Sequence, residues 1–364
     1  MLRHHLPLAP VLCAVSLVAL VACGDDGGTG GAGTGGSGTG GQTSSSSAGG
    51  GGAGGGTQPF VPTPADVQFR AVNPLPAGEQ ILLGDWEAAP NELLSMRPDG
   101  SELTPIFESF RVWSMGVSND ASTIAFAAGD PEQEAHYGPL FGDSIQPTFL
   151  YDVATETAEV LSYGNLNDEC HAFSPDDAHL YVCRRYDFDA EGVSTGYRIG
   201  RVELASKSFE WLTDEVPQLF TLSPQPLAGG TELVYAKVPV PGTRTIVRRA
   251  IAGGAETILR SNAGNPVLAP DGQGLLVSDY TQQGSLVLVR EGLADVLVAQ
   301  GPDITNARFS PDGTRVAFLR WEGSLQCSHV EIAAVDGSQA SSPERIYDCA
   351  TEGRFLSDLA WITR

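Results

Sequence analysis

Three acidic side chains at alternate positions form a recognisable cation-binding pattern. Asp187, Asp189 and Glu191 precede Gly192, as in the first half of a calcium loop with oxygen ligands at positions 1, 3 and 5 and a glycine at the sharp turn. The bidentate glutamate of such loops is missing, because Arg198 occupies position 12. Two interpretations follow: a structural calcium ion as cofactor, or a solvated acidic loop between two strands.

A second cluster combines carboxylates, a thiol and an imidazole in the segment Asp168-Glu169-Cys170-His171. It begins a predicted inner strand, where the centre of a ring-shaped fold could gather ligands. Three other histidines are scattered along the chain: His136, His179 and His329. No pair of them has the spacing of a metal site. Structural or exposed histidines are therefore favoured over a metal centre.

Motifs for covalent catalysis are weak. Gly142-Asp143-Ser144 resembles the nucleophile block of the GDSL esterases, but it falls in a predicted insertion at 129–148 and no helix follows. The part of the chain after the glycine-rich stretch contains no H-E-x-x-H and no phosphate-binding glycine loop between a strand and a helix. The sequence thus assigns no catalytic residue and favours a non-catalytic protein.

Four cysteines remain after the two near the N-terminus are set aside, an even number that suits an oxidising compartment. The register of the hairpin around Ser174-Pro-Asp-Asp177 places Cys170 opposite Cys183, and Cys327 and Cys349 fall in one later hairpin. We therefore predict two disulfides, Cys170–Cys183 and Cys327–Cys349, with four buried thiols as the alternative.

The first 22 residues have the features of a secretory signal. Arg3 is followed by an apolar run over 6–22 that is too short, and too interrupted by proline, for a membrane span. The run ends in Leu20-Val21-Ala22-Cys23, which resembles the lipobox of bacterial lipoproteins. The resemblance implies that cleavage precedes Cys23, that Cys23 receives a diacylglycerol, and that its amino group is acylated, for example with palmitate. Gly24, rather than Asp, then favours the outer membrane over the inner membrane.

Composition separates a tether from a folded part. Residues 24–57 hold 18 of the 44 glycines and no Leu, Ile, Val or Phe, so they cannot form a core. We divide the chain into a signal (1–22), a lipidated cysteine with a disordered Gly/Ser-rich tether (23–57), a lead-in segment (58–78) and a folded region (79–364). The 44 acidic and 21 basic side chains give a net charge of −23, which argues against nucleic acid as a partner.

The folded region repeats one pattern: an apolar strand, a Ser-Pro-Asp-like turn and a second apolar strand. Three good copies cover 170–182, 266–277 and 307–318, and degenerate copies cover 115–126 and 220–227. Proline presets the corner, and aspartate bonds back to the backbone. The turns fall at intervals of 41 to 56 residues, at Ser118, Ser174, Ser223, Ala269 and Ser310.

Such a period, with about four short strands per repeat, is typical of β-propeller blades. The pattern predicts an all-β, six-bladed β-propeller of four-stranded antiparallel blades. Five blades follow one another along the chain. The sixth would combine strands at 80–86, 92–96 and 102–107 with an inner strand at 356–362, so that N- and C-terminal strands share one blade and close the ring.

The Phe/Val-Ser-Pro-Asp-Gly repeat resembles that of TolB-type propellers over about residues 79 to 364. This resemblance implies a WD-repeat-like fold in the periplasm or on the cell surface, and it implies no activity.

Function is open between three hypotheses. The favoured one is an envelope-anchored, monomeric, non-catalytic scaffold for a protein or glycan partner. The alternatives are an enzyme centred on the channel, such as a metal-dependent hydrolase or a glycan lyase, and a structural component of a Tol/Pal-like complex.

Overall fold

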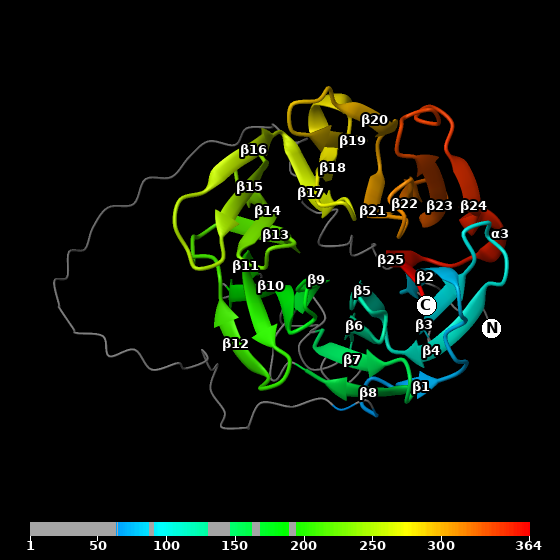
Figure 1. The fold of residues 1–364 in the computed structure, drawn as a ribbon. Helices are drawn as coiled ribbons and strands as arrows, with labels where there is room; N and C mark the ends of the chain where they lie inside the picture. The colour runs from blue at the N-terminus through cyan, green and yellow to red at the C-terminus, as the bar shows by residue number, and fades with distance from the viewer. Residues whose placement is uncertain (1–62, 64, 87–90, 130–145, 162–167, 189–193) are drawn as a thin grey trace, which may run out of the picture. The chain divides into compact units, whose positions relative to one another are not determined.

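The structure, a computed structural model, describes residues 63, 65–86, 91–129, 146–161, 168–188 and 194–364 (Figure 1). The signal, Cys23 and the tether lie outside the described residues, as do Asp189 and Glu191. Contacts divide the chain into Met1–Gly56 and Thr57–Arg364, and all the described residues belong to the second unit. Within the described ranges, no helix has the length and apolar character needed to cross a membrane.

Serine and aspartate side chains close the turns that follow the inner strands. Ser118 Oγ donates to Asp120 Oδ1 (2.8 Å) and accepts from the backbone N–H of Thr123 (2.9 Å). The same two bonds recur at Ser174 and at Ser310. Because each turn is fixed by its own side chains, the apolar residues on either side are brought together as antiparallel strands.

The described strands form five hydrogen-bonded sheets. The first has the order β1-β4-β3-β2-β25 and contains β1 (Arg70–Ala71), β2 (Glu79–Asp85), β3 (Asn91–Met96), β4 (Thr104–Ser109) and β25 (Leu356–Thr363). The second contains β5 (Val112–Val117), β6 (Thr123–Ala128), β7 (Thr148–Asp152) and β8 (Thr157–Val160) in sequence order.

Two further sheets also follow sequence order. One contains β17 (Ala263–Leu268), β18 (Gly274–Asp279), β19 (Ser285–Arg290) and β20 (Val296–Ala299), with the short 3₁₀ helix η1 (Tyr280–Gln282) after β18. The other contains β21 (Ile304–Phe309), β22 (Arg315–Glu322), β23 (Cys327–Ala334) and β24 (Glu344–Tyr347), followed by the one-turn helix α3 (Cys349–Glu352).

The remaining sheet has eight strands and consists of two antiparallel groups. One group is β9 (Asp168–Phe173), β10 (His179–Phe188), β11 (Ser194–Glu203) and β12 (Ser208–Trp211); the other is β13 (Leu219–Pro226), β14 (Glu232–Pro239), β15 (Thr245–Ala250) and β16 (Thr257–Ser261). A single parallel pair, Tyr197 with Phe220, connects the two groups.

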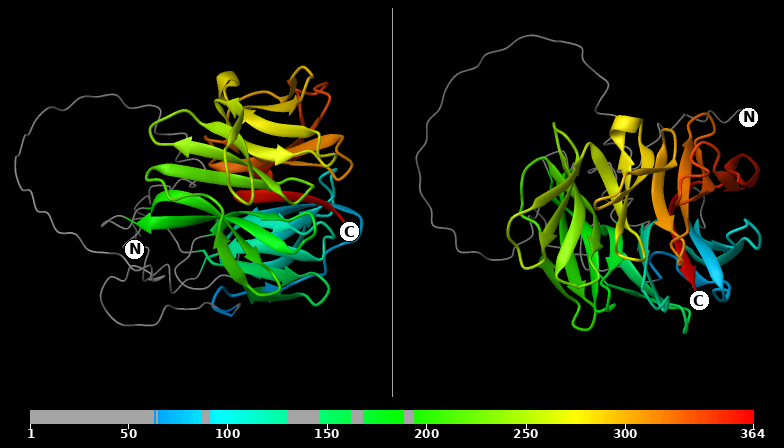
Figure 2. Two further views of the ribbon diagram at one scale, coloured as in Figure 1. Left: turned by 60° about the vertical axis from the view of Figure 1, so that its left-hand side comes forward. Right: turned by 45° about the horizontal axis from the view of Figure 1, so that its top comes forward.

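These sheets are arranged as a propeller-like ring, which confirms the predicted all-β class and its antiparallel sheets (Figures 1 and 2). The strands nearest the centre contact one another in succession: β25 with β5, then β9, β13, β17 and β21, and β21 again with β25. The red strand β25 pairs along its length with the N-terminal strand β2, from Leu356 opposite Asp85 to Thr363 opposite Glu79.

The central strands β5, β9, β13, β17 and β21 each contain a register shift in their pairing with the next strand along the chain. In four of them a residue there has a left-handed backbone, with φ between 48° and 57°: Cys170, Ser223, Asn265 and Asn306. A bulge of this kind inserts an extra residue and redirects side chains. Alternation of apolar and polar residues does not reveal it.

The bulge in β13 corrects one predicted turn. The sequence pattern predicts Ser223 at the third of the five turns, but Ser223 lies inside β13, between the shifted pairs of Leu222 and Gln225. The turn is made four residues later, where the N–H of Leu227 donates to the carbonyl of Glu232. Ser223 therefore occupies the bulge position. Leu227 is the first residue of the turn, at the position where the other copies have serine or alanine.

The core lies between neighbouring sheets. Phe107 of the first sheet packs against Phe126 and Tyr151 of the second, with ring centroids 4.8 and 5.1 Å apart, and all three side chains are fully buried. The lead-in segment takes part in this core. Its β1 pairs with β4, and its Val67 and Leu75 are buried. Residues before the first predicted strand thus belong to the folded unit.

Candidate functional site

Four aromatic side chains from distant parts of the chain meet where the central strands begin. Trp86 follows β2, Trp113 is in β5, Trp321 is in β22 and Phe355 precedes β25. All four are partly exposed. We call these four residues together with Arg111 the aromatic surface. The Ser-Pro-Asp turns lie at the other end of the same strands, so the aromatic surface and the turns occupy opposite faces of the ring.

The rings are in direct contact. Trp86 lies 5.1 Å from Trp113 and 5.1 Å from Phe355, and Phe355 lies 5.2 Å from Trp321, measured between centroids. The Trp86 backbone N–H also donates to the Phe355 carbonyl (3.0 Å), which fixes the two segments together. Side chains held in this way lose little conformational freedom when a ligand covers them, which favours binding.

Charged groups lie within and beside the aromatic surface. The guanidinium of Arg111 lies 5.4 Å from the centroid of Trp86, within cation–π distance. Arg354, next to Phe355, bridges the carboxylates of Asp85 (2.9 Å) and Glu92. Burial alone would lower the pKa of Arg354, but the two carboxylates together raise it above its ordinary value, so this side chain stays cationic. The surface thus combines apolar rings with fixed charges of both signs.

The predicted cluster at 168–171 forms a buried ionic network. Asp168 accepts two bonds from Arg184 (2.6 and 2.8 Å), and both side chains are buried. Glu169 pairs with Arg185 (3.3 Å) and accepts from the hydroxyl of Tyr197 (3.0 Å). Burial raises the pKa of Tyr197 well above its ordinary value, so the phenol remains a donor. Both carboxylates serve as anchors for buried arginines.

His171 is a structural residue that links neighbouring blades. Its Nδ1 lies 3.2 Å from Ser114 Oγ, and its Nε2 lies 2.9 Å from Thr148 Oγ1. Burial lowers the pKa of His171 to about 4, so the imidazole is neutral at pH 7. With a hydroxyl at each ring nitrogen, His171 offers no vacant ligand atom, in agreement with the structural role favoured from sequence.

Asp358 in β25 is the central carboxylate of the closing strand. Its Oδ2 accepts from the backbone N–H of Met115 (2.9 Å), and its Oδ1 lies 3.3 Å from Arg308 in β21. Burial raises the pKa of Asp358, while Arg308 opposes the shift. This single side chain connects β25 to the central strands on both sides.

The cysteines follow the prediction in one pair and depart from it in the other. The structure contains the Cys327–Cys349 disulfide. Cys170 and Cys183 are free, which corrects the disulfide predicted between them. The predicted register is wrong, because the bulge in β9 pairs Cys183 with Glu169 instead of Cys170. The simple hairpin count missed the extra residue.

The calcium prediction stays a prediction. Asp187 belongs to β10, whereas Asp189 and Glu191 lie outside the described residues. In the parts of the chain that are described, one group of three potential metal ligands has its ligand atoms within 4.8 Å of one another: His329, Asp348 and Cys349.

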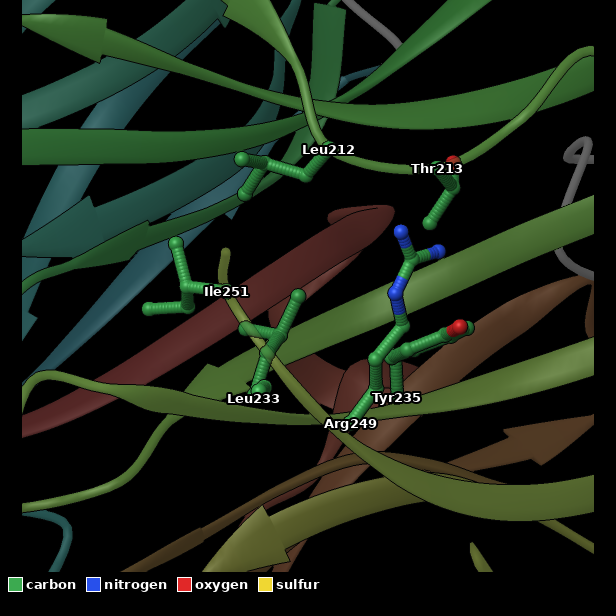
Figure 3. Close-up of a pocket in the computed structure, with 7 residues that line it drawn as sticks. Leu212, Thr213, Leu233, Tyr235, Arg249 and Ile251 are labelled. Atoms are coloured by element: carbon green, nitrogen blue, oxygen red, sulfur yellow. The ribbon is translucent and has the colours of Figure 1, made fainter. Parts of the chain in front are cut away.

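A small pocket lies between β12, β14 and β15 (Figure 3). Leu212, Leu233 and Ile251 form its apolar side, and Arg249 extends beside Tyr235 toward Thr213. About 10 Å³ of it is open to the centre of a water-sized molecule, which is room for about one water. We therefore place the candidate site at the aromatic surface and not here.

Sequence reasoning missed the aromatic surface. Its members are separated by up to 269 positions between Trp86 and Phe355, and no local spacing unites them. The available signal was position. Trp86 follows the last residue of β2, and Trp113 is the second residue of β5. Both of these strand ends lie on the same face of the ring.

No protein-family model matches the chain, and no curated protein sequence matches it. Solved structures do. TolB from Acinetobacter baumannii has a TM-score of 0.59 at 18% identity, over 79% of this chain and 67% of that protein. A putative TolB from Agrobacterium tumefaciens has a TM-score of 0.52 at 15% identity, over 80% of this chain and 100% of that protein.

A third similar structure is the periplasmic gluconolactonase PpgL of Pseudomonas aeruginosa. Its TM-score is 0.51 at 10% identity, over 78% of this chain and 99% of that protein. The three likenesses agree with the ring of sheets in defining a TolB-like propeller fold. At these identities they establish the fold and leave the activity to be argued from the site.

Proposed function

We propose that the chain is an envelope-anchored lipoprotein whose propeller is a non-catalytic binding scaffold for a protein or glycan partner. The aromatic surface is the observation that carries this proposal. Tryptophan and arginine are the residues most enriched where binding energy concentrates in interfaces, and here they are clustered, partly exposed and held in place by neighbours.

We further infer that the propeller has six blades and is closed by β25. The succession of contacts from β25 through β5, β9, β13, β17 and β21 back to β25 supports this inference. The eight-stranded sheet supplies two of the six blades, since only one residue pair joins its halves. Closure would hold the segments of the aromatic surface together, because Phe355 reaches Trp86 through the pairing of β25 with β2.

The anchor proposed for this propeller is Cys23. The lipobox-like ending of the signal and the glycine-rich tether support a lipid anchor with the folded unit held clear of the membrane, and Gly24 favours the outer membrane. Calcium bound by Asp187, Asp189 and Glu191 remains a further proposal for one loop of this fold. A monomeric propeller meeting its partner through one face is the simplest arrangement.

Substitution of single tryptophans tests the binding proposal. Trp113→Ala removes a contact ring from the aromatic surface, whereas Trp211→Ala removes an exposed tryptophan on β12, outside that surface. Envelope components captured by crosslinking to the full-length protein should be lost with Trp113→Ala and retained with Trp211→Ala. Equal capture by both variants would refute the role of the aromatic surface. Catalytic turnover of a captured glycan by the wild type would favour the channel-centred enzyme instead.

A further inference from the structure

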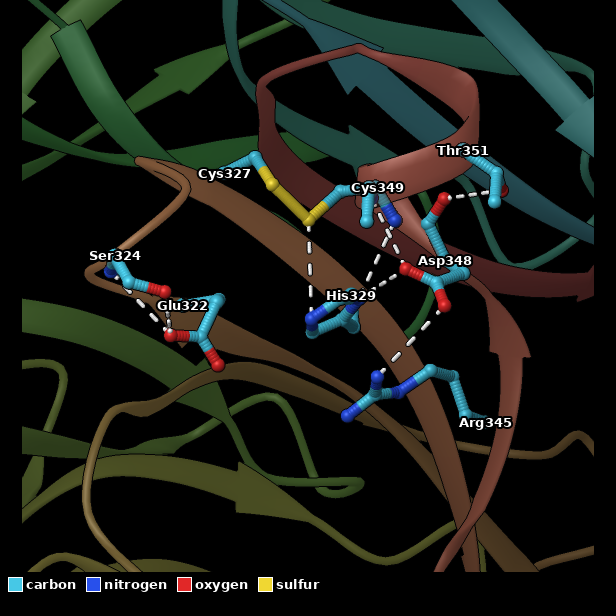
Figure 4. The surroundings of a disulfide bond; sticks show 9 residues. Glu322, Ser324, Cys327, His329, Arg345, Asp348, Cys349 and Thr351 are labelled. Atoms are coloured by element: carbon cyan, nitrogen blue, oxygen red, sulfur yellow. Dashed lines mark hydrogen bonds and ion pairs between the residues drawn. A yellow bond between two sulfur atoms is a disulfide. The ribbon is translucent and has the colours of Figure 1, made fainter.

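The disulfide Cys327–Cys349 lies within a set of side chains that could bind a metal. Cys327 and His329 are two residues apart in β23, so their side chains lie on the same side of the strand. Cys349 begins α3, and Asp348 is the residue that caps it. Figure 4 shows His329 beneath the disulfide, with Asp348 and Arg345 beside it.

The distances match a zinc site. Cys349 Sγ lies 3.8 Å from His329 Nε2. A tetrahedral zinc ion bound to one sulfur and one imidazole nitrogen separates them by about 3.6 Å, given the usual bond lengths. The other ring nitrogen, Nδ1, lies 3.2 Å from Asp348 Oδ1, and in the disulfide form it accepts from the backbone N–H of Cys349 (3.2 Å). An imidazole that binds zinc through one nitrogen commonly donates its other N–H to a carboxylate, so in the zinc form the Nδ1 proton would go to Asp348 in place of the bond from Cys349.

The surroundings suit a buried site. Cys327, His329 and Cys349 are 7%, 2% and 2% exposed. Arg345 lies 3.9 Å from Asp348 Oδ2 and balances the charge of that carboxylate. Two thiolates would neutralise the charge of a divalent zinc ion. Zinc binding by these side chains therefore requires only that the disulfide be reduced to two thiolates.

We propose that the reduced chain binds one zinc ion through Cys327 Sγ, Cys349 Sγ and His329 Nε2, with Asp348 orienting the imidazole and a water in the fourth position. The disulfide is then the metal-free, oxidised form of the same site. This inference is independent of the proposed binding function. It assigns to one blade a redox-controlled affinity for a transition-metal cation.

The interconversion balances with a protein or small-molecule disulfide as oxidant. The two zinc-bound thiolates give up two electrons and form the Cys327–Cys349 bond, and zinc leaves as a dication. The S–S bond of the oxidant breaks, and its two sulfurs take up the two electrons and two protons to become thiols. A dithiol reverses the reaction and releases two protons when zinc binds again.

Zinc binding to the full-length protein tests the proposal. The chain is reduced with a phosphine, which takes oxygen from water as the disulfide becomes two thiols, and is then equilibrated anaerobically with zinc and a chromogenic chelator. Circular dichroism checks that the fold persists. We expect one zinc per reduced chain and none per oxidised chain. Cobalt(II) should give the absorption of a tetrahedral thiolate site.

The two free cysteines provide a matched control. Cys170→Ser/Cys183→Ser should retain one zinc, Cys327→Ser/Cys349→Ser should bind none, and Asp348→Asn should bind about 10- to 100-fold more weakly. His329→Gln, which keeps a polar side chain, should also lose the site. Absence of zinc from the folded, reduced wild type, or full binding by the Cys327→Ser/Cys349→Ser variant, would overturn the proposal.

Discussion

His171 shows how a residue with possible catalytic chemistry becomes part of the framework. Its type and its position on a predicted inner strand are compatible with a metal ligand. Neighbours that sequence alone does not reveal, Ser114 and Thr148, take up both ring nitrogens. Its function is therefore decided by tertiary packing.

The pH dependence of stability should reveal this role. The pKa of His171 falls from its ordinary value of 6.5 to about 4 in the folded chain, so the unfolded chain binds a proton first as the pH drops. Stability from this residue is present above pH 6.5 and is lost toward pH 4, by about 3 kcal/mol in total. His171→Gln should flatten this part of the profile in urea titrations, whereas His179→Gln should preserve it. An unchanged slope in His171→Gln would disprove the assignment.

At the scale of elements, local chemistry predicted much of the fold. The turns at Ser118, Ser174 and Ser310 are encoded by the serine itself and by an aspartate two residues later, so the sequence motif predicts them. The bulges were not, because an extra residue such as Cys170 or Ser223 leaves the apolar pattern on both sides intact. One such residue displaced a predicted turn, and another separated two predicted disulfide partners.

Removal of β25 tests its structural role. Its residues 356–362 are buried, and Trp361 Nε1 donates to Glu79 Oε1 (2.8 Å) while Asp358 holds Met115. A stop codon at Phe355 removes these contacts and leaves the edge of β2 unpaired. Loss of a buried tryptophan alone costs about 3–5 kcal/mol, against a total stability of about 5–15.

The truncated protein should aggregate and show no cooperative thermal transition, whereas a stop codon at Arg364 should leave the transition close to that of the wild type. Cooperative melting of the longer truncation within a few degrees of the wild type would contradict both ring closure and the count of six blades.

For the whole molecule, the anchor and the binding face are separate proposals. Cys23→Ala should abolish labelling with a clickable palmitate and release the protein in soluble form or leave its signal uncleaved. The physical reason is that the sulfur is the proposed attachment point and the mature chain would hold no comparable apolar segment at its start. A Cys23→Ala protein that still requires detergent for extraction would rule out this anchor, and Cys13→Ala serves as the control.

Site-specific photocrosslinking tests the central claim, that the partner binds at the aromatic surface, most directly. A photoreactive residue in place of Phe110, beside Arg111 and partly exposed, samples that face, and one in place of exposed Gln273 samples the turns on the opposite face. In the intact envelope, the account predicts a defined adduct from position 110 that disappears with Trp113→Ala, and none from position 273. An adduct from position 273 alone, or one from position 110 that persists with Trp113→Ala, would contradict it.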